Sequence, residues 1–112
     1  MTIVHMIDRN RLVLALNGDL DLTTADALRE ALDDLLSHYP QKQVALDLGD
    51  VDFVDSSGLG VILGRYRRLK QAGRSLCLIG VRPSVLSVLE IAGIPSVMAV
   101  AGVPSKPWAR DS

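Results

Sequence analysis

The middle of the chain contains the run Asp55-Ser56-Ser57-Gly58-Leu59-Gly60-Val61-Ile62-Leu63-Gly64-Arg65-Tyr66. Its apolar spacing predicts a helix that starts near Ser56 and ends before Gly73. Either Asp55 or Ser56 could serve as the N-cap. Three residues of the run are glycines, and each costs a helix interior about 1 kcal/mol relative to alanine. Three glycines in one helix indicate that contacts with the rest of the chain, or with a partner, offset this loss of helix stability.

One face of this helix should pack on a sheet and the opposite face should be exposed, at about 100° per residue. The predicted inward face consists of Leu59, Ile62, Leu63, Tyr66 and Leu69. The predicted outward face consists of Ser57, Gly60, Val61, Gly64 and Arg68. Gly60 and Gly64 lie one turn apart and should leave a smooth strip beside an exposed Val61, against which another chain could pack closely. The alternative is that the glycines let the helix approach its own neighbours; their position opposite the apolar stripe favours the binding surface.

Ser57 falls in the first turn of the predicted helix, where its hydroxyl should be exposed. A phosphate there would add about −1.5 to −2 charges at a helix end that tolerates anions. The fold should survive, but a bulky dianion beside the glycines would oppose a closely packed partner. We therefore predict that phosphorylation of Ser57 switches binding off. The competing interpretation is that Ser56 and Ser57 are only capping residues.

The flanking sequence predicts alternating strands and helices. Strands at 3–7 and 12–16 should form a hairpin through the polar turn 8–11. A helix capped by Thr23 or Thr24 should run to about His38, and further strands are expected at 43–48, 75–79 and 97–100. A third helix should start at Pro83 and end before Gly93. The order ββαβαβαβ indicates an α/β fold with a mixed sheet of about five strands and three to four helices packed on it. We expect one domain over residues 1–103 and an irregular tail over 104–112.

Composition excludes several classes of function. The 112 residues are 48% hydrophobic with a net charge of −1, and only four are aromatic, Tyr39, Phe53, Tyr66 and Trp108. One ordinary core is expected, and nucleic-acid binding is disfavoured. The single Cys77 lies in an apolar stretch and should be a buried structural thiol. Because no apolar run approaches a spanning length and no leader-like start is present, we expect a cytoplasmic protein without a membrane segment.

Enzyme and cofactor motifs are also missing. Ser57 lacks the Gly-x-Ser-x-Gly frame, and the two histidines, His5 and His38, are expected on the surface. The glycines match no nucleotide-binding loop. Asp19 and Asp21 have no further ligands at metal spacing and suit turn and helix-start roles. A phospho-aspartate receiver is disfavoured by the opening hairpin. We therefore expect no catalytic residue, no cofactor and no metal.

The 55–66 run, with Gly18-Asp19-Leu20-Asp21 before it and residues 84–93 after it, resembles the STAS-domain anti-sigma factor antagonists, most closely the sporulation members that act on anti-sigma F factors. The resemblance covers residues 3–100. It implies that Ser57 is the phosphoacceptor and that Asp21, Asp55 and Ser56 line the partner interface. Together with the helical projection, the expected partner-binding set is Asp21, Asp55, Ser56, Gly58, Gly60, Val61 and Gly64.

The resemblance further implies a partner switch. The unphosphorylated protein would bind an anti-sigma factor with serine kinase activity and release a sigma factor, and a PP2C-type phosphatase would reset it. The chain departs from the family at its end, where a fourth helix usually follows the last strand and this sequence has Pro104 and Pro107. The alternative is another class of STAS module, a stressosome scaffold or a lipid-transport component that acts on no sigma factor.

Overall fold

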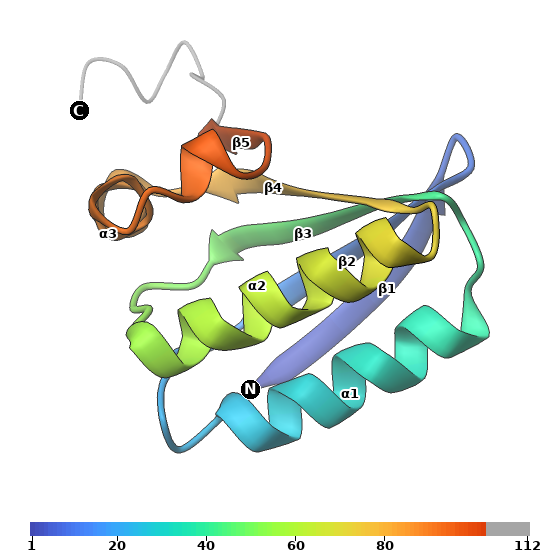
Figure 1. Ribbon diagram of the computed structural model, residues 1–112. Helices are drawn as coiled ribbons and strands as arrows, with labels where there is room; N and C mark the ends of the chain where they lie inside the picture. The colour runs from blue at the N-terminus through green and yellow to red at the C-terminus, as the bar shows by residue number, and fades with distance from the viewer. Residues whose placement is uncertain (103–112) are drawn as a thin grey trace, which may run out of the picture.

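The computed structural model describes residues 1–102 and confirms the predicted order of elements (Figure 1). The elements are β1 (Thr2–Asp8), β2 (Arg11–Asn17), α1 (Ala25–His38), β3 (Gln43–Asp50), α2 (Ser56–Gln71), β4 (Ser75–Val81), α3 (Pro83–Ile91), the 3-10 helix η1 (Ile94–Ser96) and β5 (Val100–Gly102). The predicted tail 104–112 lies outside the described residues.

The five strands form one sheet in the order β1-β2-β3-β4-β5. β1 and β2 are an antiparallel hairpin, and β2 to β5 run parallel to one another. Arg9 and Asn10, in the two-residue turn of the hairpin, have φ angles of 51° and 68°, the left-handed conformation that a type I′ turn requires. Because β2, β3 and β4 are parallel, the loops that follow them meet at one end of the sheet.

The last strand was predicted at 97–100 and lies at Val100–Gly102 instead. Residues 97–99 follow η1, and the N–H groups of Val97 and Met98 both donate to the Ile94 carbonyl, at 2.8 Å and 3.1 Å. Pro95 lies inside this turn, where its fixed φ is compatible with a helical turn and its missing N–H disfavours a strand. The apolar residues Val97 and Met98 therefore belong to the connection and not to the strand.

The core lies between the sheet and two helices. α1 and α2 run along the same face of the sheet, and α3 lies at one end of it (Figure 1). Alternate residues of β2 and β3 point to this face, because side chains alternate along a strand. The largest fully buried side chains here include Leu12, Leu14, Leu16, Leu46, Leu48, Leu28, Leu32 and Ile62.

The buried face of α2 differs from the predicted one. The buried residues of this helix are Gly58, Val61, Ile62, Arg65 and Leu69, whereas Leu59, Leu63 and Tyr66 are half-buried. The expectation that Val61 is exposed is wrong, since it is 6% exposed and belongs to the core. Arg65 belongs to the buried face, where it forms an ionic contact with α1 that the apolar pattern does not reveal.

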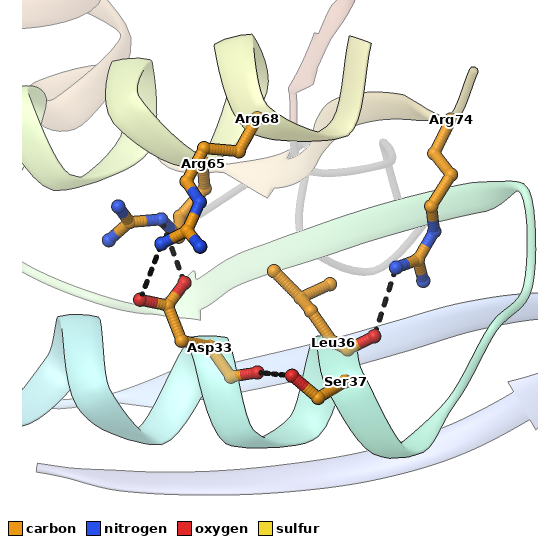
Figure 2. Close-up of polar contacts among 6 residues, drawn as sticks. All are labelled: Asp33, Leu36, Ser37, Arg65, Arg68 and Arg74. Atoms are coloured by element: carbon orange, nitrogen blue, oxygen red, sulfur yellow. Dashed lines mark hydrogen bonds and ion pairs between the residues drawn. The ribbon is translucent and has the colours of Figure 1, made fainter. Parts of the chain in front are cut away.

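That contact joins α2 to Asp33 of α1 (Figure 2). Arg65 Nε lies 3.1 Å from Asp33 Oδ1, and Arg68 Nη1 lies 3.1 Å from Asp33 Oδ2. The Arg65 side chain is 8% exposed and that of Asp33 is 33% exposed. Desolvation lowers the pKa of Arg65, and the charge of Asp33 opposes that shift. The Asp33 carboxylate therefore provides the opposite charge for two guanidinium groups, the nearly buried one of Arg65 and the exposed one of Arg68.

A third arginine, Arg74, hydrogen-bonds to the C-terminal end of α1 and to the segment that follows it. Arg74 donates to the carbonyls of Gln41 and Leu36 at 2.9 Å each and to that of Tyr39 at 2.6 Å. These bonds provide donors for the end of the helix and the segment after it, where carbonyls otherwise lack partners. Desolvation lowers the pKa of Arg74. Arg74 thus ties the start of β4 to the end of α1.

Candidate functional site

The loops after β2 and β3 are joined at the end of the sheet where α2 begins. Leu20 and Val54 form a short parallel bridge. The Leu20 N–H donates to the Phe53 carbonyl at 2.9 Å, and the Asp55 N–H donates to the Leu20 carbonyl at 3.0 Å. Two segments more than thirty residues apart are thereby held side by side, which fixes the start of α2 relative to the start of α1.

Asp55 is the N-cap of α2, which settles the choice between Asp55 and Ser56. Its Oδ1 accepts from the N–H groups of Ser57 at 2.8 Å and Gly58 at 3.1 Å, as an N-cap carboxylate does. Its Oδ2 accepts from the Leu22 N–H at 3.3 Å. Asp55 therefore caps one helix and holds the loop before the other, while Ser56 is exposed.

Asp21 organises the start of α1. Its Oδ1 accepts from the Thr23 hydroxyl at 2.7 Å, from the Thr23 N–H at 2.9 Å and from the Thr24 N–H at 3.1 Å. The hydrogen bond from the Thr23 hydroxyl, together with those from the backbone, lowers the pKa of Asp21. Thr24 is the N-cap but makes no capping bond with its side chain. The predicted helix-start role of Asp21 is confirmed.

Gly58 is required for packing inside the chain. A Cβ atom placed on it would lie 2.7 Å from Leu20 Cβ and would also collide with the Leu20 backbone. Gly58 is buried, so it contributes no surface of its own. For this glycine the interpretation that we ranked second, approach to a neighbouring segment, is correct.

Gly60 and Gly64 behave differently, because a Cβ atom at either position would meet nothing within 4 Å. Gly60 is exposed and Gly64 is half-buried. Nothing in the described residues requires glycine at these two positions. Ser56, Ser57, Gly60 and Gly64 are called the glycine strip below; Val61, which was expected beside it, lies in the core.

Ser57 is half-buried at the start of this strip. Its N–H is bonded to Asp55, as described above. Within residues 1–102 its hydroxyl forms no hydrogen bond, so no internal hydrogen bond orients it.

The part of the chain that the structure describes contains no group of three or more His, Cys, Asp and Glu side chains arranged to hold a metal ion. In residues 1–102, no helix is long and apolar enough to span a membrane. Cys77, expected to be buried, is partly exposed.

The family model that describes the STAS domain matches residues 3–105. The chain belongs to the STAS-domain family. This STAS domain is 37% identical over 90 residues to an anti-sigma F factor antagonist of Paenibacillus polymyxa, covering 80% of this chain and 77% of that protein. It is 30% identical over 94 residues to an anti-sigma-B factor antagonist of Listeria monocytogenes, covering 81% and 79%.

Solved structures share the fold. The anti-sigma factor antagonist SpoIIAA in its unphosphorylated form superposes with a TM-score of 0.73 at 24% identity, covering 98% of this chain and 94% of that one. The phosphorylated form of SpoIIAA from Bacillus superposes with a TM-score of 0.65 at 23% identity, covering 98% and 97%. The STAS-like fold expected from the sequence is confirmed.

Two exposed apolar residues of this STAS domain, on the loops joined at the start of α2, were not predicted from the sequence. Leu22 is 77% exposed and Phe53 is 51% exposed. The Leu22 N–H bonds to Asp55, and the Phe53 carbonyl accepts from Leu20, so both belong to the joined loops. The alternation of Phe53 with buried Val54 could have indicated its outward position. These two side chains expose apolar area on the loops that are joined at the start of α2.

Proposed function

We propose that this protein is an anti-sigma factor antagonist whose unphosphorylated form binds an anti-sigma factor through the glycine strip and releases a sigma factor. The observation that carries the proposal is the open space over Gly60 and Gly64, which follows directly on from Ser57. Two relatives that share more than three quarters of their length with this chain are named as such antagonists.

A close-fitting partner suits this surface. Glycines in the middle of a helix lower its stability, and no contact within residues 1–102 requires glycine at positions 60 and 64. Without side chains, a partner's backbone or bulky side chains can approach the helix axis of α2 closely. Leu22 and Phe53 would contribute apolar area at the edge, and Asp21 and Asp55 would keep both loops in place.

Phosphorylation of Ser57 supplies the switch in this proposal. The Ser57 N–H is 2.8 Å from Asp55 Oδ1, so the phosphate would lie near a carboxylate that already occupies the helix end. The added charge of about −1.5 to −2 would therefore repel Asp55 and any acidic partner group. The helix N-terminus favours anions, which offsets part of this repulsion and preserves the fold. The main change is on the surface that the partner contacts.

Other proteins would carry out the chemistry of the switch. The anti-sigma factor would be the serine kinase that modifies Ser57, and a PP2C-type phosphatase would remove the phosphate. This chain would have no catalytic activity of its own and would act in the cytoplasm. Ser57 would serve as substrate in both reactions.

The test uses the anti-sigma kinase encoded in the same genome, ATP, and intact-mass and phosphosite mapping. We expect one phosphate on Ser57, its loss in Ser57→Ala, and normal phosphorylation in the matched control Ser56→Ala. In a binding assay Ser57→Ala should bind like the parent, and Ser57→Asp should bind about tenfold more weakly or worse. Normal binding by Ser57→Asp would contradict the switch. No phosphate with an active kinase would favour the scaffold or lipid-transport alternative.

A further inference from the structure

β1 forms one edge of the sheet, and within residues 1–102 it pairs only with β2. Val4, Met6 and Ile7 are 64%, 57% and 47% exposed. Proteins usually protect such edges with lysine, proline, inward charges or bulges. Residues 2–7 contain no lysine, proline or acidic residue, and the register with β2 runs without interruption. This edge is long, apolar and open.

The hairpin determines which backbone groups face outward. In a two-residue hairpin the residues that flank the turn, Asp8 and Arg11, form a hydrogen-bonded pair, and such pairs alternate along the ladder. Thr2, Val4 and Met6 therefore share the orientation of Asp8 and bond to β2. The N–H and C=O groups of Ile3, His5 and Ile7 point away from the sheet. These three residues form a set that is symmetric about His5.

We propose that two copies of this chain associate by antiparallel pairing of their β1 strands, centred on His5. In this register His5 meets His5 of the second copy, and Ile3 meets the second copy's Ile7. Each of these residues can exchange both main-chain hydrogen bonds with its opposite number. On the other face Val4 lies opposite Met6. The pairing is isologous, as a two-fold dimer requires.

Charge favours this orientation over the parallel one. In the antiparallel register Asp8 lies opposite Thr2, so no like charges meet on paired residues. A parallel pairing in register would place Asp8 against Asp8, and like charges directly opposite one another destabilise a sheet.

A groove beside β1 provides a second, independent feature. It has a volume of about 480 Å³ and lies between β1 and α1, with Ile3, Ala27, Ala31 and Leu35 in its lining. The second copy's Ile7 would lie opposite Ile3, and paired residues of adjacent strands project to the same face. This side chain, 47% exposed in the single chain, would therefore enter the groove. The two alanines leave room for it, and symmetry repeats the contact twice.

The acidic rim of the groove agrees with the same arrangement. Asp34 lines the groove. The second copy's turn, which carries Arg9 directly after Asp8, would lie beyond Thr2 at the Met1 end of β1. An Arg9 side chain that reaches Asp34 would add some salt dependence to the association.

The first measurement is the mass of the full chain in solution, by sedimentation equilibrium or light scattering, from low micromolar to millimolar concentration. We expect the mass to rise from 12.1 kDa toward twice that value. His5→Pro removes an N–H that points to the free edge, a position where strands tolerate proline. This variant should remain at the mass of a single chain. Because it also removes the 2.7 Å contact between His5 Nε2 and the Tyr39 hydroxyl, its circular dichroism and its thermal unfolding are measured to show that the fold is kept.

A second pair of variants leaves the strand intact. Ala31→Arg fills the groove from α1, whereas the matched control Ser37→Arg adds the same charge to the flank of α1 that faces α2. We expect Ala31→Arg to weaken self-association at least tenfold and Ser37→Arg to leave it within twofold. A parent chain that stays monomeric throughout would overturn the proposal. Equal association of the parent, His5→Pro and Ala31→Arg would show that a different surface pairs, and would overturn it as well.

Discussion

The two faces of α2 use the same residue for opposite purposes. On the buried face, Gly58 leaves room for Leu20, with which any side-chain atom would collide. On the outward face, Gly60 and Gly64 leave space that nothing in residues 1–102 fills. On helix propensity alone, each of the three glycines lowers the stability of the helix by about 1 kcal/mol relative to alanine. The role of a glycine in a helix must therefore be judged by what a Cβ atom at its position would meet.

Contacts on the buried face of α2 also offset the helix stability that the glycines on its outward face cost. Asp55 caps the first turn of α2 through two backbone N–H groups, a feature typically worth about 1 kcal/mol. Further along, Arg65 binds Asp33 of α1. A helix anchored at its start and along one side can leave its other side without packing side chains. In this interpretation the contacts with α1 and with the Leu20 loop make a glycine-rich binding surface possible.

Removing the charge partner of the buried face should have the largest effect. Asp33→Ala leaves the Arg65 guanidinium, whose side chain is 8% exposed, without its carboxylate, and an unpaired buried charge is strongly destabilising. We expect the free energy of unfolding to fall by about 3 kcal/mol, measured by urea denaturation. The matched control Asp34→Ala removes an exposed carboxylate from the next position and should stay within about 0.5 kcal/mol of the parent. Equal losses in the two variants would show that Arg65 does not depend on Asp33.

A side chain added where α2 packs against the Leu20 loop should have the next largest effect on the free energy of unfolding. Gly58→Ala places a methyl group 2.7 Å from Leu20 Cβ and against the Leu20 backbone. Overpacking of this kind typically costs about 2 kcal/mol, even though alanine is the better helix former. We expect a loss of about that size in the same urea experiment. A gain in stability from Gly58→Ala would mean that the two loops separate easily and that they do not form a fixed site.

The order of elements was predictable because each signal is local. Pro83 starts α3, alternating apolar residues mark β3, and the Asp55 cap marks the start of α2. The position of the last strand was less accessible, because Val97 and Met98 are apolar enough for a strand and only the turn around Pro95 excludes them. The family resemblance implied that Ser57 and Asp55 are site residues; it did not reveal that Gly58 and Val61 are internal.

The orientation of α2 shows why the error at Val61 arose. The projection assumed that the most apolar arc faces the core, which placed Leu59 and Leu63 inward and Val61 outward. In the structure Arg65 belongs to the buried face, because Asp33 comes from α1, far away in the sequence. Charge pairs between distant segments are invisible to a periodicity argument. The same limit hid Leu22, whose place beside Asp55 depends on a hydrogen bond across 33 positions.

Substitutions on the outward face should have the smallest effect on stability and should separate it from binding. Gly60→Ala and Gly64→Ala place a methyl group in open space and remove the helix penalty of glycine, so each should raise the free energy of unfolding by about 1 kcal/mol. If the glycine strip is the binding surface, the same two variants should bind the anti-sigma factor more weakly, and Gly60→Arg should abolish detectable binding. Thermal unfolding and titration calorimetry on one set of samples would measure both quantities. Stabilised variants that bind as tightly as the parent would exclude the glycine strip as the contact, whereas opposite changes in stability and affinity would show that α2 retains its glycines for a partner.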